Sequence, residues 1–490
     1  MSSIAPPTKN ESLLVFSDVH LGSDLNDRDT GHVVRRSHKI DRDLVELLRH
    51  YLAETPAGDR WRIVIAGDFI DFIGITVGAG EEDLATELTA EEQEHGLGNA
   101  SDHARIKLRR VADRHGDVFE ALAAFVAEGH ALTVVHGNHD VEFHWDEVKS
   151  DFRRILLGHA EARAAKSGAA LDGSFLDRIE FNPWFFYWNG VAYIEHGHQY
   201  DPYCVTEHVM APLSPFDPRR VARGFCDVLL RHVVRPTRGM REHGHENTGL
   251  GYYLAFGAKQ GIGGMAKLGL RFARAVLELF RLRQEHLSEA ATALRSEHER
   301  RMALLAEATR IGRDRIRALA AMQAMPVTRS IRGILASVLL DRLAVALAAS
   351  ILLTAVAILG AFHGHFLWAG LGVLGAWFLA HRHLSASRHV DPADEMADRA
   401  THLARLLPAA FVVMGHTHIP TRIPVNEGAS TYINLGSWAE DEPSEEATDY
   451  RAARTHLVIR IENGAPVAKL LAWDAETGPK RFSMPPPPAA

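Results

Sequence analysis

The chain has 490 residues and a net charge of −8; 46% of the residues are hydrophobic and 24% are charged. These proportions are typical of a globular protein and exclude a disordered chain, a collagen and a small disulfide scaffold. The mild acidity argues against a dedicated nucleic-acid coat protein, and the only two cysteines, Cys204 and Cys226, fit a reducing cytosol.

The first part of the chain predicts strands that alternate with helices. Residues 1–11 are polar and lack the apolar core of a signal peptide, so we expect a flexible N-terminus. Short apolar runs predict strands at Leu13–Phe16, Arg62–Ala66, Ala131–Val135 and Val191–Ile194, and helical spacing predicts helices at Ile40–Leu52 and Phe119–Glu128. The acidic, glycine-containing stretch Val77–Asp117 is expected to be a partly helical surface excursion.

The middle of the chain is basic. From Arg219 to Arg342 there are 23 Lys or Arg and 11 Asp or Glu. This excess predicts a surface that faces lipid headgroups, phosphate or nucleic acid, although a solvated helical arm has the same composition. Leu268–Met325 contains no proline and favours long amphipathic helices, and the aromatic, charge-poor stretch Gly249–Lys267 is interpreted as an interfacial segment.

An apolar run follows this basic section. Leu343–Ala380 contains no Asp, Glu, Lys or Arg, and Ala344–Phe362 is long enough to cross a bilayer. The sequence His363-Gly364-His365 breaks the run into two halves, so we expect an apolar helical hairpin, transmembrane or re-entrant. A buried helical pair in a soluble core and an apolar dimer interface are the alternatives. Arginines on both flanks predict a cytosolic location for both ends of the hairpin.

The last part of the chain returns to short strands. Strands are predicted at Phe411–Met414 and Thr431–Leu435, and Glu462-Asn463-Gly464 predicts a hairpin between His456–Ile461 and Val467–Trp473. Residues 476–490 form a proline-rich tail.

Five polar clusters follow predicted strands at the points where those strands end. They are Asp18-Val-His20, Gly67-Asp68-Phe-Ile-Asp71, Gly137-Asn138-His139-Asp140, His196-Gly-His198 and Gly415-His416-Thr-His418. Ligand sites in α/β sheets gather beyond the carboxyl ends of the strands, so residues far apart in sequence can meet there. Carboxylate, imidazole and amide groups suit manganese, iron, zinc or nickel. A pair of such ions about 3.5–4 Å apart can activate a water and bind phosphoryl oxygens.

Each cluster has an ordinary interpretation when it is taken by itself. Gly67-Asp68 and Gly137-Asn138 fit simple turns, and His196 with His198 fits two surface histidines. The ordered set of five, each behind a predicted strand, is what favours a metal site.

In these motifs the chain resembles the calcineurin-like metallophosphoesterase superfamily. The resemblance covers roughly Ser12–Asp201 and Phe411–Asp474 and includes all five motifs in the family order. It implies an α/β fold with a four-layer α/β/β/α sandwich, formed here by residues 12–204 and 409–475. A basic helical insertion (205–342), the apolar hairpin (343–381) and a return linker (382–408) would interrupt that domain.

The resemblance also implies roles for individual residues. One metal would be bound by Asp18, His20 and His418, and the other by Asn138, His196 and His416, with Asp68 as the bridge. His139 would protonate the leaving group or steady the phosphoryl oxygen, and Asp71 would orient His139. His196 is preferred over His198 as the ligand, which leaves His198 for substrate or a supporting contact. Asn434 would support the loop near the site. Manganese is the expected metal.

The implied function is a membrane-associated phosphoesterase that hydrolyses a phosphodiester, pyrophosphate or phosphomonoester bond with a metal-activated water. The motif forms are most similar to UDP-diacylglucosamine pyrophosphatase-like enzymes, so a UDP-lipid or phospholipid-like substrate is expected. The chain departs from them at His139, where they have arginine, and at His198, where they have aspartate. A nuclease or cyclic-nucleotide phosphodiesterase that uses the basic insertion is the alternative, and a non-enzymatic membrane scaffold is a further one.

The order of the motifs constrains the topology. His196 precedes the apolar run, whereas His416 and His418 follow it. If these residues share one site, the chain must return to the side of the membrane that it left, so the number of crossings is even.

Overall fold

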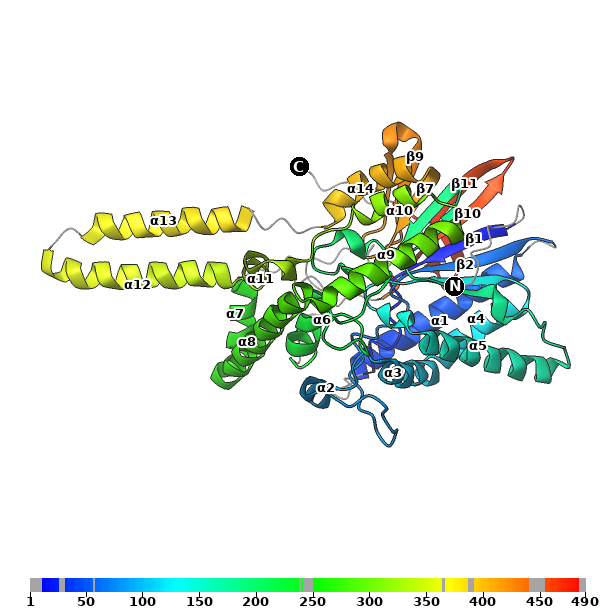
Figure 1. The fold of residues 1–490 in the computed structure, drawn as a ribbon, viewed down its shortest axis with the longest axis horizontal. Coiled ribbons are helices and arrows are strands. Elements are labelled where there is room, and N and C mark those ends of the chain that lie inside the picture. The colour runs from blue at the N-terminus through cyan, green and yellow to red at the C-terminus, as the bar shows by residue number, and fades with distance from the viewer. Residues whose placement is uncertain are drawn as a thin grey trace.

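The computed structural model describes residues 11–25, 31–55, 58–237, 240, 250–363, 366–386, 392–439 and 454–483. Within these residues the protein is a mixed α/β structure with two β-sheets and 14 α-helices (Figure 1). Three predicted features lie wholly or partly outside the described residues: the N-terminal segment up to residue 10, residues 364–365 between the two halves of the apolar run, and the tail from residue 484.

The larger sheet has seven strands in the order β12-β11-β10-β1-β2-β3-β4. The strands β1 to β4 are parallel, whereas β10 to β12 are antiparallel to their neighbours. Their bounds are β1 (Glu11–Phe16), β2 (Arg60–Ala66), β3 (Ala131–Val135), β4 (Ile179–Asn182), β10 (Thr455–Glu462), β11 (Ala465–Asp474) and β12 (Gly478–Arg481).

The smaller sheet has five strands in the order β5-β6-β7-β9-β8, of which β6, β7 and β9 are parallel. Their bounds are β5 (Phe185–Trp188), β6 (Gly190–Glu195), β7 (Ala409–Met414), β8 (Thr421–Val425) and β9 (Ser430–Asn434). β6 and β7 pair although the whole basic and apolar insertion separates them in sequence, so this pairing joins the two halves of the chain.

The core explains why the predicted strands are apolar on both faces. Successive side chains of a strand point to opposite faces of the sheet. In β1, Leu13 and Val15 pack in a cluster with residues of the smaller sheet such as Ile194 and Val413. Leu14 and Phe16 pack in a different cluster with residues of nearby helices.

Most of the first five helices pack against the larger sheet. Their bounds are α1 (Gly31–Ala53), α2 (Ala90–His95), α3 (Ser101–Arg114), α4 (Gly116–Ala127) and α5 (Asp146–Ser167). Residues of α1, α3, α4 and α5 share one hydrophobic cluster with β1, β2 and β3. The prediction of a surface excursion over Val77–Asp117 is therefore wrong for α3, because that helix buries Ala104, Leu108 and Val111 in the cluster that it shares with the sheet.

The insertion begins with the short α6 (Phe225–Leu229), which continues into a π-helical turn at Leu230–Val234. The predicted long helices are α7 (Leu250–Lys259), α8 (Gly261–His286), α9 (Ala290–Thr309) and α10 (Arg313–Ala320). Residues of α9 and α10 pack with the smaller sheet, as do residues of α14 (Pro392–Leu406). The segment predicted as a return linker thus contains a helix that belongs to the packed fold.

The apolar run forms two helices that project from the rest of the molecule side by side (Figure 1). After α11 (Ile331–Ser337), the run lies in α12 (Leu340–His363) and α13 (Phe366–Ala386). In the described part of the chain, one stretch, Leu340–Gly360, is long and apolar enough to cross a membrane, and most of its residues are exposed or half-buried. This arrangement does not fit the alternative of a helical pair buried in the protein core.

Part of the excess positive charge of the insertion is neutralised inside the protein. Arg220 donates to Glu92 with a nitrogen–oxygen distance of 2.8 Å, and both side chains are almost fully buried. Arg223 and Arg231 both donate to Glu91, at 2.5 and 2.8 Å. The acidic stretch around α2 is therefore the partner of these three arginines, which the sequence had led us to expect at an anionic surface.

The Glu91 pairing predicts a large loss of stability on neutralisation. Burial alone would raise the pKa of Glu91, but Arg223 and Arg231 hold it well below its usual range. Glu91→Gln leaves these cations without their carboxylate, and we expect the free energy of unfolding to fall by about 3 kcal/mol. Urea unfolding of the detergent-solubilised protein measures this change. Glu94→Gln on the same helix removes only the exposed pair with Arg274 and should cost less than about 1 kcal/mol; equal losses in the two variants would contradict the prediction.

Candidate metal centre

The five polar clusters converge beyond the carboxyl ends of five strands in the two sheets. They follow β1, β2, β3, β6 and β7 directly. Backbone hydrogen bonds tie the loops together: the amide of Asp18 donates to Gly67 at 3.2 Å, and the amide of Gly415 donates to His196 at 2.9 Å. Residues from both halves of the chain therefore meet in one place, as the motif order requires.

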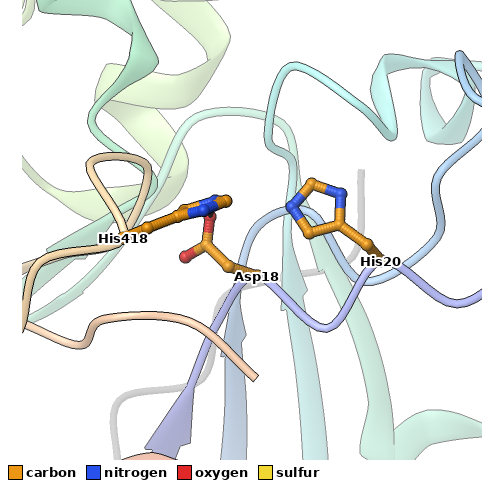
Figure 2. A group of neighbouring side chains, drawn as sticks. All are labelled: Asp18, His20 and His418. Carbon is orange, nitrogen blue, oxygen red and sulfur yellow. Dashed lines mark ion pairs between the residues drawn. The ribbon is translucent and has the colours of Figure 1, made fainter. Parts of the chain in front are cut away.

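The first group consists of Asp18, His20 and His418 (Figure 2). Their ligand atoms all lie within 4.8 Å of one another, and His418 Nε2 is 3.1 Å from a carboxylate oxygen of Asp18. Asp18 and His20 are buried and leave β1, whereas His418 approaches from the loop after β7. These three residues are the set that the sequence assigned to one metal, and the group could hold a metal ion.

The second group consists of Asp18, Asp68 and His196. His196 Nε2 lies 3.1 Å from Asp68 Oδ2 and 3.1 Å from the amide oxygen of Asn138. His196 Nδ1 is 2.9 Å from the carbonyl oxygen of Ala66. A carbonyl oxygen only accepts, so Nδ1 carries the hydrogen, and Nε2 is the nitrogen that faces the carboxylates.

Asp68 lies between the two groups, in the place expected of a bridge. Its Oδ2 atom is 3.1 Å from His196 Nε2 and 3.8 Å from His20 Nε2. Asp18 is also a member of both groups, whereas the resemblance implied that Asp18 would bind one metal only.

His416 has neighbours that the sequence did not reveal. Its Nε2 atom is 2.9 Å from Asp201 Oδ2, and these two residues form a third group with Cys204. The ring of His416 lies 5.3 Å from that of His196, so it borders the second group without sharing its set of ligand atoms. A carboxylate behind an imidazole orients the ring for its metal. Asp201, three residues after His198, is therefore placed to orient His416, and the predicted fourth motif, which ended at His198, did not include it.

His196 and His198 differ in their surroundings. His198 Nε2 lies 2.8 Å from the side-chain nitrogen of Gln199, which can only donate, so His198 accepts there. Among the described residues, none of the metal-capable groups contains His198. Burial and the nearby His196 and His416 lower the pKa of His198 well below its usual value. This placement agrees with the choice of His196 as the ligand and leaves His198 as a neutral neighbour.

His139 lies at the end of a chain of contacts that reaches into the insertion. His139 Nδ1 is 2.6 Å from Asp71 Oδ1, and the guanidinium of Arg235 donates to Asp71 Oδ2 at 3.1 Å. Arg235 is buried, follows the π-helical turn, and also donates to the carbonyl of Ser23 at 2.9 Å. Asp71 is therefore placed as expected, whereas Arg235 was not found from the sequence because no local pattern marks it.

The backbone at the candidate ligands is in an unusual conformation. Asp18, His20, Asp68, His416 and His418 all have φ between 52° and 69°, in the left-handed region. Such a conformation costs of order 1 kcal/mol or more for each non-glycine residue, and it clusters at functional sites. Asn138 and His196 are outside this group of positive-φ residues.

Two motif glycines are required because carboxylates pass close to them. A Cβ atom on Gly137 would lie 2.1 Å from Asp68 Oδ1, and one on Gly415 would lie 2.4 Å from Asp18 Oδ2. Any side chain at either position would push a carboxylate out of the site. Asn434 supports the same region, because its amide donates to the carbonyl of Gly415 at 2.6 Å.

The electrostatics of the centre fit bound cations. Burial would raise the pKa of Asp18, but His196 and His418 lower it to about 2. Burial would lower the pKa of His196, but Asp68 and Asp18 raise it to about 10. A buried site that holds several carboxylates and needs a protonated imidazole to balance them is suited to positive ions. The oxygen and nitrogen donors match manganese, iron, zinc or nickel.

A scan against protein-family models and a search of curated proteins found no match. The resemblance to metallophosphoesterases therefore depends on the five motifs and on the way in which their residues meet.

The raised pKa of His196 predicts that metal binding releases protons. At pH 7 the metal-free imidazole carries a proton, because its pKa is about 10. A metal that takes Nε2 displaces this proton, so the affinity should rise about tenfold for each pH unit. Calorimetric titration with Mn²⁺ at pH 6, 7 and 8, in buffers of different ionisation enthalpy, measures the protons released. An affinity that does not change with pH would contradict His196 as a ligand; His402→Gln, at an exposed position on α14, is the control.

Proposed function

We propose that the protein is a membrane-associated, metal-dependent phosphoesterase with a dinuclear centre. The observation that carries this proposal is the convergence of Asp18, His20, Asp68, His196 and His418 into two overlapping groups that could each hold a metal ion. The expected four-layer α/β/β/α sandwich is the finer form of the fold that we propose. The two sheets share one cluster, and each has a further cluster with helices, which supports it.

Two divalent cations, most simply manganese, would activate a water and neutralise the charge that develops on the phosphoryl oxygens. The protein holds Asp68 between the two groups and fixes the His196 tautomer through the carbonyl of Ala66. It thereby presents oxygen and nitrogen ligands in a fixed geometry.

His139 is suited to donate a proton to the leaving group. Burial lowers the pKa of His139, but Asp68 and Asp71 raise it to about 9, so the imidazole is protonated at neutral pH. Asp71 holds Nδ1 at 2.6 Å, which leaves Nε2 as the nitrogen that can pass a proton to substrate. We propose this role in preference to one in which His139 only steadies the phosphoryl oxygen.

The substrate class that we propose is a lipid-linked phosphoester, including UDP-lipids. One cavity is lined by Asn138 and by large side chains that include Tyr203, Phe225 and Leu282, of which the last two belong to the insertion. An apolar wall next to a metal centre suits a substrate with an apolar part. The nuclease alternative is less well supported, because arginines such as Arg220 and Arg231 are buried in ion pairs and cannot meet a nucleic acid.

The membrane part of the proposal rests on the projecting helices. Large side chains of α12 and α13 are exposed along their length, including Leu347, Ile351 and Trp368. The arginines that flank the hairpin favour a cytosolic catalytic domain at the cytoplasmic membrane.

Removal of the bridging carboxylate or of His416 tests the proposed function. Asp68→Ala and His416→Ala should each lower the rate of hydrolysis of an aryl phosphodiester by more than about a hundredfold. Loss of a supporting residue behind a ligand already costs 10- to 100-fold. Bound manganese should fall in parallel, while both variants remain in the membrane fraction. Asp172→Ala, at an exposed carboxylate, is the matched control. Normal turnover by either site variant would rule out the dinuclear proposal.

Arg235 is predicted to act as a positioning residue through Asp71. Arg235→Met removes the donor at Asp71 Oδ2, and we expect kcat to fall about tenfold because His139 is held less firmly. Manganese content and KM should stay unchanged, because Arg235 contacts Asp71 and not the candidate metal ligands. Arg235→Lys should restore part of the rate. Arg274→Met, which removes an exposed ion pair of the same insertion, is the control. A loss of bound metal in Arg235→Met would point to a purely structural role instead.

A further inference from the structure

Helix α8 carries an apolar face that no described part of the chain covers. Ile262 is 90% exposed, Leu277 70% and Leu270 56%. An α-helix has 3.6 residues per turn, so these three positions fall within about 80° of one another. Ala266 and Ala273, which are also exposed, lie on the same face. The result is a continuous apolar stripe along most of the helix.

The opposite face of α8 is seated in the protein. Leu268, Ala275 and Leu282, each seven residues apart, are buried in a cluster with Val228 and Ile334. Helix α8 therefore has two apolar faces: one is packed in the protein core, and the other, the stripe, is exposed. An isolated solvent-exposed arm would place polar residues there.

Basic residues run beside the stripe. Lys267, Arg274 and Arg281 are also seven residues apart and form a line between the exposed and the buried faces. Arg274 lies 2.9 Å from Glu94 and Arg281 lies 3.8 Å from Glu278, and both arginines keep at least half of their side-chain surface exposed. An apolar stripe bordered by cations is the pattern of a helix that lies in a membrane interface.

Helix α8 lies near the base of the projecting helices. Helix α11 contacts both α8 and α12, and Figure 1 shows α7 and α8 beside α11 at the end of the molecule from which α12 and α13 project. Ile331 and Arg332 on α11 and Arg382 on α13 are exposed there as well. If α12 is inserted in a bilayer, α8 would therefore lie close to the lipid headgroups.

We propose that α8 lies in the surface of an anionic phospholipid bilayer, with Ile262, Leu270 and Leu277 in the boundary of the acyl chains. This inference rests on the membrane part of the proposed function and adds a second, in-plane contact to it. Lipid headgroups are the occupant that matches both the apolar stripe and the adjacent cations, since each Lys or Arg near an anionic surface contributes about 1 kcal/mol. The catalytic domain would then be held at a defined orientation to the lipid that carries its substrate.

Site-specific fluorescence on the full chain tests the proposal. An environment-sensitive amino acid, introduced genetically at position 270 or 277, reports on α8. The same probe at position 352 of α12 reports on the hairpin, and at position 300, where Arg300 is exposed on α9, it is the aqueous control. Each protein is reconstituted into vesicles of phosphatidylcholine with or without phosphatidylglycerol, and quenching by iodide in the water is compared.

We expect the probes at 270 and 277 to shift their emission to the blue and to lose most of their iodide quenching when phosphatidylglycerol is present. The probe at 300 should remain fully quenched. Lys267→Gln combined with Arg281→Gln should restore quenching at 270 without affecting 352.

Quenching at 270 and 277 in both kinds of vesicle would overturn the α8 proposal, while protection at 352 would still support membrane insertion. Quenching at 352 as well would remove the membrane part of the proposed function. Protection at 270 in detergent, dependent on protein concentration but not on anionic lipid, would show that a second copy covers the stripe and would also overturn the proposal. Hydrolysis of a soluble aryl phosphodiester, measured on the same samples, tests the phosphoesterase function separately.

Discussion

The structure depends on the compensation of carboxylates that are buried together. Asp18, Asp68 and Asp71 are almost inaccessible to water and lie around one centre. In an environment of low dielectric, such a concentration of negative charge is costly unless positive charge is supplied. In the metal-free protein the protonated imidazoles of His139 and His196 supply it, and two cations would supply it more fully. The left-handed backbone at five candidate ligands is a strain that this electrostatic gain offsets.

The same principle governs the contact between the insertion and the rest of the fold. Glu91 and Glu92 would be costly to bury alone, and Arg220, Arg223 and Arg231 of the insertion neutralise them. Arg235 extends this set of contacts to Asp71 and so reaches the candidate proton donor. The insertion is therefore attached to the rest of the fold by buried charge, and its position is physically connected to the contacts of His139.

The projecting helices are linked to the two sheets through the insertion. Helices α12 and α13 project from the rest of the molecule. At their base α11 contacts α12, and α8 contacts α11. A bilayer that held α12 and α8 would fix the orientation of the insertion, and through the buried ion pairs it would also fix the orientation of the two sheets. The cavity that Asn138 helps to line is also lined by Phe225 and Leu282 of this insertion, so an apolar part of a bound substrate would contact the insertion.

The sequence by itself determined those features that leave a local pattern. Runs such as Ala131–Val135 and Phe411–Met414 predicted strands because both of their faces are buried, and the five motifs at strand ends predicted which side chains would meet. The short strands β4, β5, β8 and β12, the helix α5 and the helix in the predicted linker were missed, and the prediction of a tail from residue 476 is wrong for β12, which pairs with β11. Only the tertiary structure decided the partners: Asp201 for His416, Arg235 for Asp71, and the acidic α2 for the arginines of the insertion. Arg235 and Asp71 are 164 residues apart, and an isolated arginine far from its carboxylate looks like any surface cation. The carbonyl of Ala66 likewise distinguishes His196 from His198 through a contact of the folded backbone, which no spacing in the sequence encodes.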